Sequence, residues 1–136
     1  MKTVEGKYIG ELRTEATHVK SGTVLVTDAP VDNQGRGEFF SPTDLVATAL
    51  GSCMVTIMGI AGRTHGFTLE GATWSIIKVM ADNPRRIGEI IIELNIPGIF
   101  SDKQKIIIDH ITKNCPVALS LHSELKQTVT INYPDM

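Results

Sequence analysis

The stretch from Ser41 to Gly59, SPTDLVATALGSCMVTIMG, carries the strongest fold signal in the chain. Its first residue is a favourable helix N-cap, Pro42 suits the first helical position, and Asp44 completes an S-x-x-D capping box. From Leu45 to Gly62 no side chain is charged. We therefore predict a long apolar helix that begins after the serine and ends near His65.

This uncharged run is long enough to raise the question of a membrane-spanning helix. Small and hydroxyl-bearing residues dilute its hydrophobicity, namely Thr48, Gly51, Ser52, Thr56, Gly59 and Gly62. The segments around it are patterned like those of a soluble protein, and a helix that is apolar all round can lie in the centre of a domain or a dimer. We predict such a core helix, with no membrane partner.

The composition is that of a single-domain protein. The 136 residues fit one domain, 1–136, and the formal net charge is −2. The largest basic cluster, Arg85-Arg86, is too small for a nucleic-acid footprint, so no nucleic-acid partner is expected. Because the N-terminus lacks the apolar region of a signal peptide, we expect a cytoplasmic protein whose thiols are kept reduced.

Further patterns predict how the rest of the chain folds around this helix. Alternating or β-branched segments indicate strands, and Ser101 and Pro116 each begin a helical segment. The predicted strands cover residues 8–13, 22–27, 67–80, 87–96 and 128–133, and residues 28–37 form a loop. The resulting order, strand-strand-helix-strand-strand-helix-helix-strand, indicates an α+β fold in which helices pack on an antiparallel sheet.

The chain has two cysteines, Cys53 and Cys115, which lie 62 positions apart. This spacing matches neither a disulfide framework nor a zinc site, and the four histidines show no metal-like spacing. Cys53 shares one face of the predicted helix with Ala49 and Ile57. It is therefore either a small core residue or a reagent kept away from water.

Cys115 directly precedes Pro116, at a predicted helix N-terminus. There the helix dipole and the backbone N–H groups lower the pKa of a thiol; the alternative is a modest N-cap or a junction residue. A low-pKa thiol can attack an O–O bond and become a sulfenic acid, and a second thiol can then condense with it to a disulfide. The pair favours redox chemistry, provided that the two sulfurs meet.

The block SPTDLVATALGSCM, together with CPVALSL at the second cysteine, resembles the two signature elements of the OsmC/Ohr family. These are osmotically induced and organic-hydroperoxide-resistance proteins. The order of elements is similar to that of the family over nearly the whole chain. The resemblance implies an OsmC-like fold, in which antiparallel sheets wrap around central helices in an intertwined homodimer.

The resemblance also implies the chemistry of a thiol-dependent hydroperoxide reductase. Cys53 matches the peroxidatic cysteine, which becomes the sulfenic acid, and Cys115 matches the resolving cysteine, which closes the disulfide. An arginine from the early loop region would steady the thiolate, and we expect Arg36 in this role, with Arg13 second. The implied partners are a hydroperoxide, preferably an organic one, and a dithiol reductant; no cofactor and no metal are implied.

One position departs from the family pattern. Thr43 stands where the well-studied peroxidases have a glutamate that hydrogen-bonds to the arginine, and Glu38 could supply the missing carboxylate. The departure leaves two alternatives open. One is a non-catalytic OsmC-like protein that binds a small molecule or serves in a stress response, and the other is a structural dimer whose cysteines are core residues.

Overall fold

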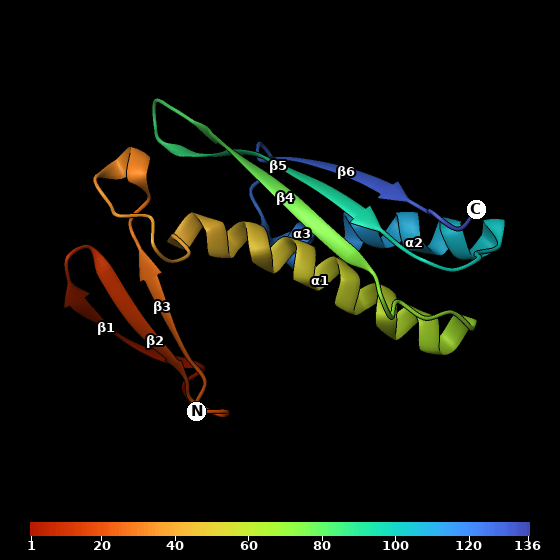
Figure 1. Cartoon of the computed structure of the whole chain (residues 1–136), viewed down its shortest axis with the longest axis horizontal. Helices are drawn as coiled ribbons and strands as arrows, with labels where there is room; N and C mark the ends of the chain where they lie inside the picture. The colour runs from red at the N-terminus through yellow and green to blue at the C-terminus, as the bar shows by residue number, and fades with distance from the viewer. The chain divides into compact units, whose positions relative to one another are not determined.

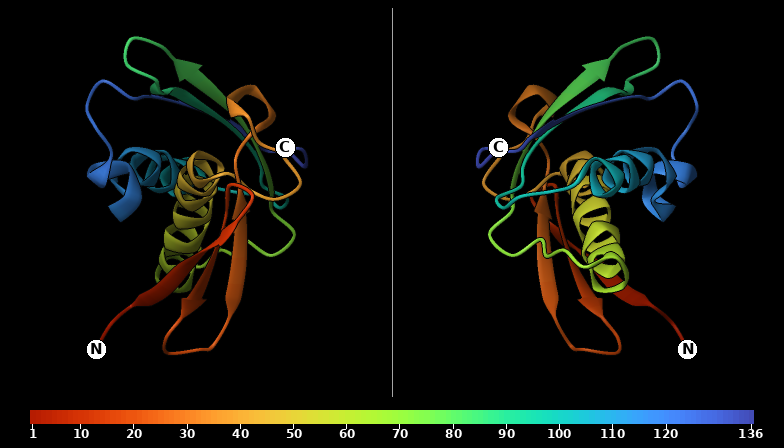
Figure 2. Two further views of the ribbon diagram at one scale, coloured as in Figure 1. Left: turned by 90° about the vertical axis from the view of Figure 1, so that its left-hand side faces the viewer. Right: turned by 90° about the vertical axis from the view of Figure 1, so that its right-hand side faces the viewer.

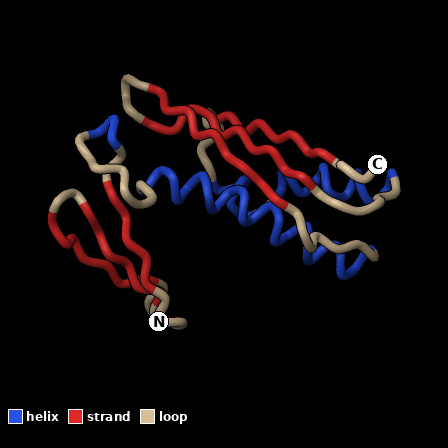
Figure 3. Tube along the Cα trace, viewed as in Figure 1, coloured by secondary structure: helices blue, strands red, loops and turns tan.

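The computed structural model describes residues 1–136, which divide into two compact units, Met1–Val46 and Ala47–Met136. The elements in chain order are β1 (Val4–Gly10), β2 (Arg13–His18), β3 (Val24–Asp28), η1 (Val31–Asn33), α1 (Pro42–His65), β4 (Thr73–Ala81), β5 (Arg86–Asn95), α2 (Asp102–Asn114), α3 (Pro116–Ser120) and β6 (Lys126–Asn132) (Figure 1). The mixture of helices and strands, distinguished by colour in Figure 3, confirms the predicted α+β class. A single domain over the whole chain stays a prediction.

The first unit is built on a three-stranded antiparallel sheet in the order β1-β2-β3. A tight turn joins β1 to β2, and in it Gly10, Glu11 and Leu12 have φ angles of 91°, 56° and 62°. The prediction of one strand over residues 8–13 is wrong, because this turn falls inside that segment. Residues other than glycine seldom adopt such left-handed conformations. The residue types at Glu11 and Leu12 therefore give no sign of a turn, and the segment resembles one continuous strand.

The sheet of the first unit has one charged and one apolar face. Residues paired across strands share a face, and the Lys7–Glu15 pair, with 3.5 Å between Nζ and Oε1, marks the charged one. The apolar face carries Val4, Gly6, Tyr8, Ala16 and Leu25, and its polar members are Thr14, His18 and Thr27. None of the fully buried apolar residues of the protein lies in this unit, so no hydrophobic core lies beneath this face.

The second unit is a three-stranded sheet with all its helices on one face (Figures 1 and 2). β4 pairs antiparallel with β5, whereas β6 pairs parallel with β5. The expected sheet was antiparallel throughout, and β6 is the exception. Its direction follows from the connection. The two helices α2 and α3 lie between β5 and β6, and they return the chain to the end of the sheet at which β5 begins.

The hydrophobic core lies between this sheet and the helices. Leu50, Met54 and Met58 recur every fourth residue along α1 and are all 0% exposed. They pack in one cluster with Ile90 and Ile92 of β5. By length and composition α1 could also cross a membrane, but its buried side chains have partners in this core. The prediction of a core helix is confirmed.

The start and the end of α1 agree with the predicted signals. Ser41 Oγ accepts from the N–H of Asp44 at 3.1 Å, and Asp44 Oδ2 accepts from the N–H of Ser41 at 3.0 Å, which completes the capping box. After His65 the chain turns at Gly66, whose φ is +78°. Both ends of the helix that carries Cys53 are therefore determined locally.

Candidate active site

Cys53 lies in the middle of α1 and is partly exposed. Its side chain packs at the margin of the core cluster, together with Val55 and Ile57 of the same helix. Cys53 thus lies at the boundary between the hydrophobic core and the surface.

Cys115 occupies the junction between α2 and α3 and is 0% exposed. Its backbone N–H donates to the carbonyl of Ile111 at 3.1 Å, which closes the end of α2. Its Sγ accepts from the N–H of Ala118 at 3.4 Å, which caps the start of α3. One residue thus terminates one helix and begins the next, so the sulfur has little freedom to move.

The structure brings the two thiols together. The Cys53 side chain lies near enough to Cys115 to raise the pKa of its thiol, and the two cysteines are not joined in a disulfide. Burial raises the pKa of the Cys115 thiol, and the Cys53 contact adds to this, while the N–H groups of Ala118 and Val117 act in the opposite direction. The prediction of a low pKa at Cys115 is wrong, because burial outweighs the field of a five-residue helix.

A second polar cluster lies entirely within the first unit, around Arg13 at the start of β2. Arg13 Nη2 donates to Asp28 Oδ2 at 3.3 Å and to Glu38 Oε1 at 2.6 Å. Its guanidinium also lies over the ring of Phe39, 5.0 Å from the centroid. Asp28 is the residue opposite Arg13 in the pairing of β2 with β3, so the sheet itself presents this carboxylate to the arginine.

The two carboxylates of this cluster differ in burial. The side chain of Asp28 is 0% exposed and that of Glu38 is 55% exposed. Burial alone would raise the pKa of Asp28, but the N–H of Glu38, the Arg13 guanidinium and the N–H of Ala29 together hold it below its usual value. The hydrogen bond with Asp28 in turn raises the pKa of Arg13 against the effect of burial. The pair stays ionised.

The other expected site residues lie nearby in the same unit. The side chain of Arg36 is 58% exposed; its Nη2 is 3.5 Å from Glu11 Oε2 and its Nη1 is 4.0 Å from Glu38 Oε1. Glu38 therefore contacts both candidate arginines. Thr43 hydrogen-bonds with Ser41 at the start of α1, with 3.2 Å between Oγ1 and Oγ.

Sequence reasoning missed Asp28, which was assigned to the start of a loop. The available signal was an acidic residue at the end of an apolar strand, in VLVTD. At that place the carboxylate accepts a hydrogen bond from a backbone N–H, that of Glu38. Across the chain, no group of three or more His, Cys, Asp or Glu side chains is arranged to hold a metal ion.

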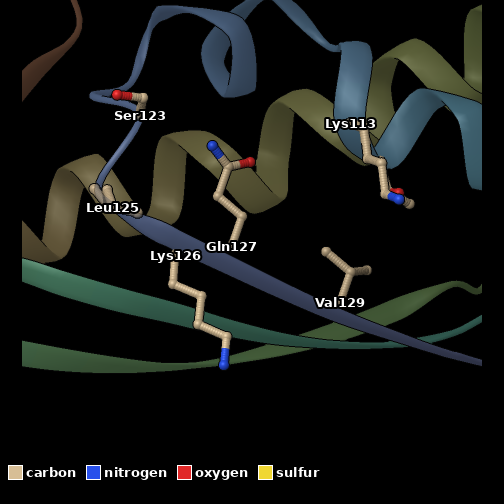
Figure 4. Close-up of a pocket in the computed structure, with 7 residues that line it drawn as sticks. Lys113, Ser123, Leu125, Lys126, Gln127 and Val129 are labelled. Atoms are coloured by element: carbon tan, nitrogen blue, oxygen red, sulfur yellow. The ribbon is translucent and has the colours of Figure 1, made fainter.

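The second unit also contains a pocket of about 540 Å³ beside β6 (Figure 4). It is lined by Thr112, Lys113, Ser123, Leu125, Lys126, Gln127 and Val129. Gln127 Nε2 donates to the carbonyl of Ala118 at 3.1 Å, and the N–H of Ala118 is the donor to Cys115 Sγ. The pocket lining includes neither cysteine, but Ala118 contacts both sides, through its N–H to Cys115 and through its carbonyl to Gln127 in the pocket wall.

Comparisons with known proteins agree on one family. The model of a family described as OsmC-like protein matches residues 35–130. A solved structure from Psychrobacter arcticus 273-4, provisionally named an osmotic stress induced and detoxification response protein, is 46% identical in sequence. The match covers 97% of this chain and 96% of that chain, with a TM-score of 0.93. No match was found among curated proteins.

More distant solved structures share the fold. An OsmC-like protein from Mycoplasma pneumoniae is 18% identical over 96% of this chain and 94% of that chain, with a TM-score of 0.79. An organic hydroperoxide resistance protein from Legionella pneumophila is 13% identical over 97% of this chain and 98% of that chain, with a TM-score of 0.72. At such identities the likeness concerns the fold alone, and it confirms the fold expected from the two cysteine motifs.

Proposed function

Because the chain belongs to the OsmC-like family, we propose that it is a cysteine-based peroxidase, which reduces organic hydroperoxides with electrons from an external dithiol. The observation that carries this proposal is the proximity of the Cys53 and Cys115 side chains. Two free thiols 62 positions apart in the sequence meet in the fold. A sulfenic acid formed on one of them has the other within reach.

The proposed reaction has three balanced steps. The Cys53 thiolate attacks the terminal oxygen of ROOH, the O–O bond breaks, and the alkoxide takes up a proton and leaves as the alcohol. The resulting Cys53 sulfenic acid is attacked by the sulfur of Cys115, the S–S bond forms and water is released. A dithiol then reduces the disulfide by exchange and is itself oxidised to a disulfide.

The different surroundings of the two thiols support this division of roles. Cys53 is partly exposed, so a peroxide can reach it, whereas Cys115 is fully buried. Burial also raises the pKa of Cys115, which keeps this residue a thiol until a sulfenic acid forms beside it. Ile57, an apolar residue one turn along the same face of α1, favours an organic peroxide over a small polar one.

For the residue that steadies the thiolate, we propose Arg13, with Arg36 as a second candidate and Glu38 as a supporting carboxylate. The order of the arginines is the reverse of that expected from the sequence. The side chain of Arg13 is 20% exposed and held by two carboxylates and an aromatic ring. The side chain of Arg36 is 58% exposed, and an exposed ion pair orients an arginine poorly.

We further propose that the protein works as a homodimer. The apolar face of the first unit has exposed side chains, with Tyr8 at 66% and Leu25 at 44%. A three-stranded sheet of this kind needs a covered face to be stable. A second copy of the chain is the occupant that the family fold implies.

The state of the thiols bears on where the protein works. The proposed reaction starts from two thiols and needs a dithiol to restore them after each turnover. A reducing compartment maintains such a pair as thiols between turnovers. We therefore propose a cytoplasmic location, where dithiol reductants are present.

A single-turnover experiment on the reduced protein tests the proposed function. About one equivalent of cumene hydroperoxide is added, the reaction is quenched within seconds, and the mass and the free thiols are measured. We expect both thiols to be lost together with about 2 Da of mass, the two hydrogens removed by disulfide formation. Cys53→Ser is the control, which should consume no peroxide. Two persistent thiols in the wild-type protein would refute the proposal.

One observation favours a second candidate function, a small-molecule binding or stress protein without turnover. Thr43 provides no carboxylate at the start of α1, where the well-studied peroxidases have one. If the thiols are inert to peroxide and a ligand is found by native mass spectrometry of the purified protein, this second function replaces the first.

A further inference from the structure

We propose that Asp28 is a positioning residue for the peroxidase reaction: it holds Arg13 in a fixed orientation, while Glu38 is a partner that Arg13 exchanges for the reacting anion. The proposal rests on the function proposed above, in which Arg13 steadies the Cys53 thiolate. It gives the two carboxylates of one cluster different tasks, and it assigns a task to a residue that the sequence did not single out.

The first argument is the fixed position of Asp28. Its carboxylate is 0% exposed, and its Oδ2 accepts from the N–H of Glu38 at 3.0 Å as well as from Arg13. The N–H of Asp28 donates to the carbonyl of Phe40 at 3.0 Å. The loop that follows β3 is thus hydrogen-bonded both to the side chain and to the backbone of Asp28. A buried carboxylate that lost its arginine would be left uncompensated, which is strongly unfavourable.

The second argument is the contrasting freedom of Glu38. Its side chain is 55% exposed, and water can take over its hydrogen bonds when it leaves Arg13. Its Oε1 is already 4.0 Å from Nη1 of Arg36, which gives the released carboxylate a second cation nearby. Exposed ion pairs contribute little to stability, so Glu38 can be displaced at a small cost.

The third argument is that both carboxylates share one nitrogen. Asp28 and Glu38 both accept from Nη2 of Arg13, while Nε of Arg13 and Oδ1 of Asp28 are buried without any partner. Buried polar atoms are rarely left in this state. The arginine therefore keeps unused donor capacity, and an incoming anion competes with the exposed Glu38 rather than with the buried Asp28.

The carboxylate of Asp28 comes from β3, whereas the carboxylate in the first turn of α1, Asp44, is bound to the N–H of Ser41. Because Asp28 is the cross-strand partner of Arg13, its orientation is determined by sheet pairing and not by a flexible side chain.

The test compares two isosteric variants, Asp28→Asn and Glu38→Gln, each in the wild-type and in the Arg13→Lys background. The first readout is the rate constant of Cys53 oxidation by cumene hydroperoxide. We expect Asp28→Asn to lower it by about tenfold or more, as for the loss of a charge-assisted hydrogen bond. Glu38→Gln should change it by less than about threefold. In the Arg13→Lys background, Asp28→Asn should have no further effect.

The double variant separates positioning from general damage. An equal loss with and without Arg13→Lys would mean that Asp28 acts only on the fold, and a larger loss for Glu38→Gln than for Asp28→Asn would exchange their roles. Either result overturns the proposal. If Asp28→Asn does not fold, Asp28→Glu keeps the charge and displaces the guanidinium, and it should lower the rate in a way that again vanishes in the Arg13→Lys background.

A readout without peroxide distinguishes failure of this inference from failure of the proposed function. The buried Nε–H of Arg13 is expected to give a slowly exchanging NMR signal. Asp28→Asn should shift it and speed its exchange by about tenfold or more, and Glu38→Gln should leave it nearly unchanged. Wild-type thiols that ignore peroxide would refute the peroxidase, whereas an Arg13 signal indifferent to Asp28→Asn would refute the positioning role.

Discussion

Cys115 is completely buried, whereas Cys53, the neighbouring thiol on α1, is partly open to solvent. The two sulfurs therefore meet at a boundary between the surface and the core. A reagent from solution encounters only Cys53. A group that it adds to the Cys53 sulfur then lies beside the thiol of Cys115. This asymmetry gives direct predictions for how each thiol reacts.

Alkylation should label the two cysteines at very different rates. Iodoacetamide applied to the reduced, folded protein should modify Cys53 at least about tenfold faster than Cys115, because burial both shields Cys115 and raises the pKa of its thiol. Peptide mapping by mass spectrometry measures the two rates. Labelling in denaturant is the control, and there the difference should disappear. Equal rates in the folded protein would contradict the described geometry.

Cys115→Ser should separate peroxide attack from disulfide formation. The variant should still react once with cumene hydroperoxide, since Cys53 is unchanged, but its sulfenic acid has no thiol to condense with. A sulfenic-acid probe such as dimedone should then trap Cys53, with about 16 Da of added oxygen seen before trapping. Continued turnover with a dithiol at the wild-type rate would show that the disulfide is not an intermediate.

Acid should destabilise the first unit through Asp28. The pKa of this carboxyl is lower in the folded protein than its ordinary value of 3.8, so the unfolded chain binds its proton first as the pH falls. The stabilisation is therefore complete above about pH 4 and is lost as the pH drops below that through the folded pKa. Urea unfolding at pH 7 and pH 3 measures the loss, which Asp28→Asn should reduce. The exposed pair residue Glu5, as Glu5→Gln, is the control.

The dimer can be tested on the two faces of the first sheet. Val24 and Leu25 are neighbours in β3 whose side chains point to opposite faces, and Leu25 belongs to the apolar face. Leu25→Lys should shift the protein from dimer to monomer in sedimentation experiments and lower its melting temperature. Val24→Lys, on the charged face, should leave the dimer intact. A wild-type monomer at micromolar concentration would rule out the proposed assembly.

Removing core volume from α1 should cost far more than removing surface volume elsewhere. Leu50 is 0% exposed and Leu119 is 66% exposed. Leu50→Ala should reduce the free energy of unfolding by about 2–5 kcal/mol. Leu119→Ala should change it by less than about 0.5 kcal/mol. Chemical denaturation of both variants makes the comparison, and similar losses would show that α1 does not pack as described.

Local signals in the sequence predicted local structure well. The capping box at Ser41 and Asp44, the glycine after His65 and the capping serine of α2 are all used as expected. The predictions that were wrong concern features that depend on residues elsewhere in the chain. Leu12 adopts a left-handed turn that its own residue type disfavours, and the parallel direction of β6 reflects the path of α2 and α3.

In the candidate site, too, the motifs could be predicted locally, whereas the surroundings of each residue could not. Both cysteines were recognised from motifs, but the pKa of Cys115 depends on burial, which no local pattern records. Arg13 and Asp28 are 15 positions apart and meet only because β2 pairs with β3. From the sequence, Arg36 is preferred over Arg13 because it lies in the early loop. In the structure the two arginines differ in burial, and Arg13 is the more buried one.

The Sγ of Cys115 is also the cap of α3, since it accepts from the N–H of Ala118. If this sulfur enters a disulfide, that cap must share or lose its acceptor. The carbonyl of the same residue, which belongs to the next peptide group, accepts from Gln127 at the wall of the β6 pocket. Oxidation of a buried sulfur would thus be felt at the pocket through one residue, and the hydrogen exchange of the Ala118 N–H would report the redox state of Cys115.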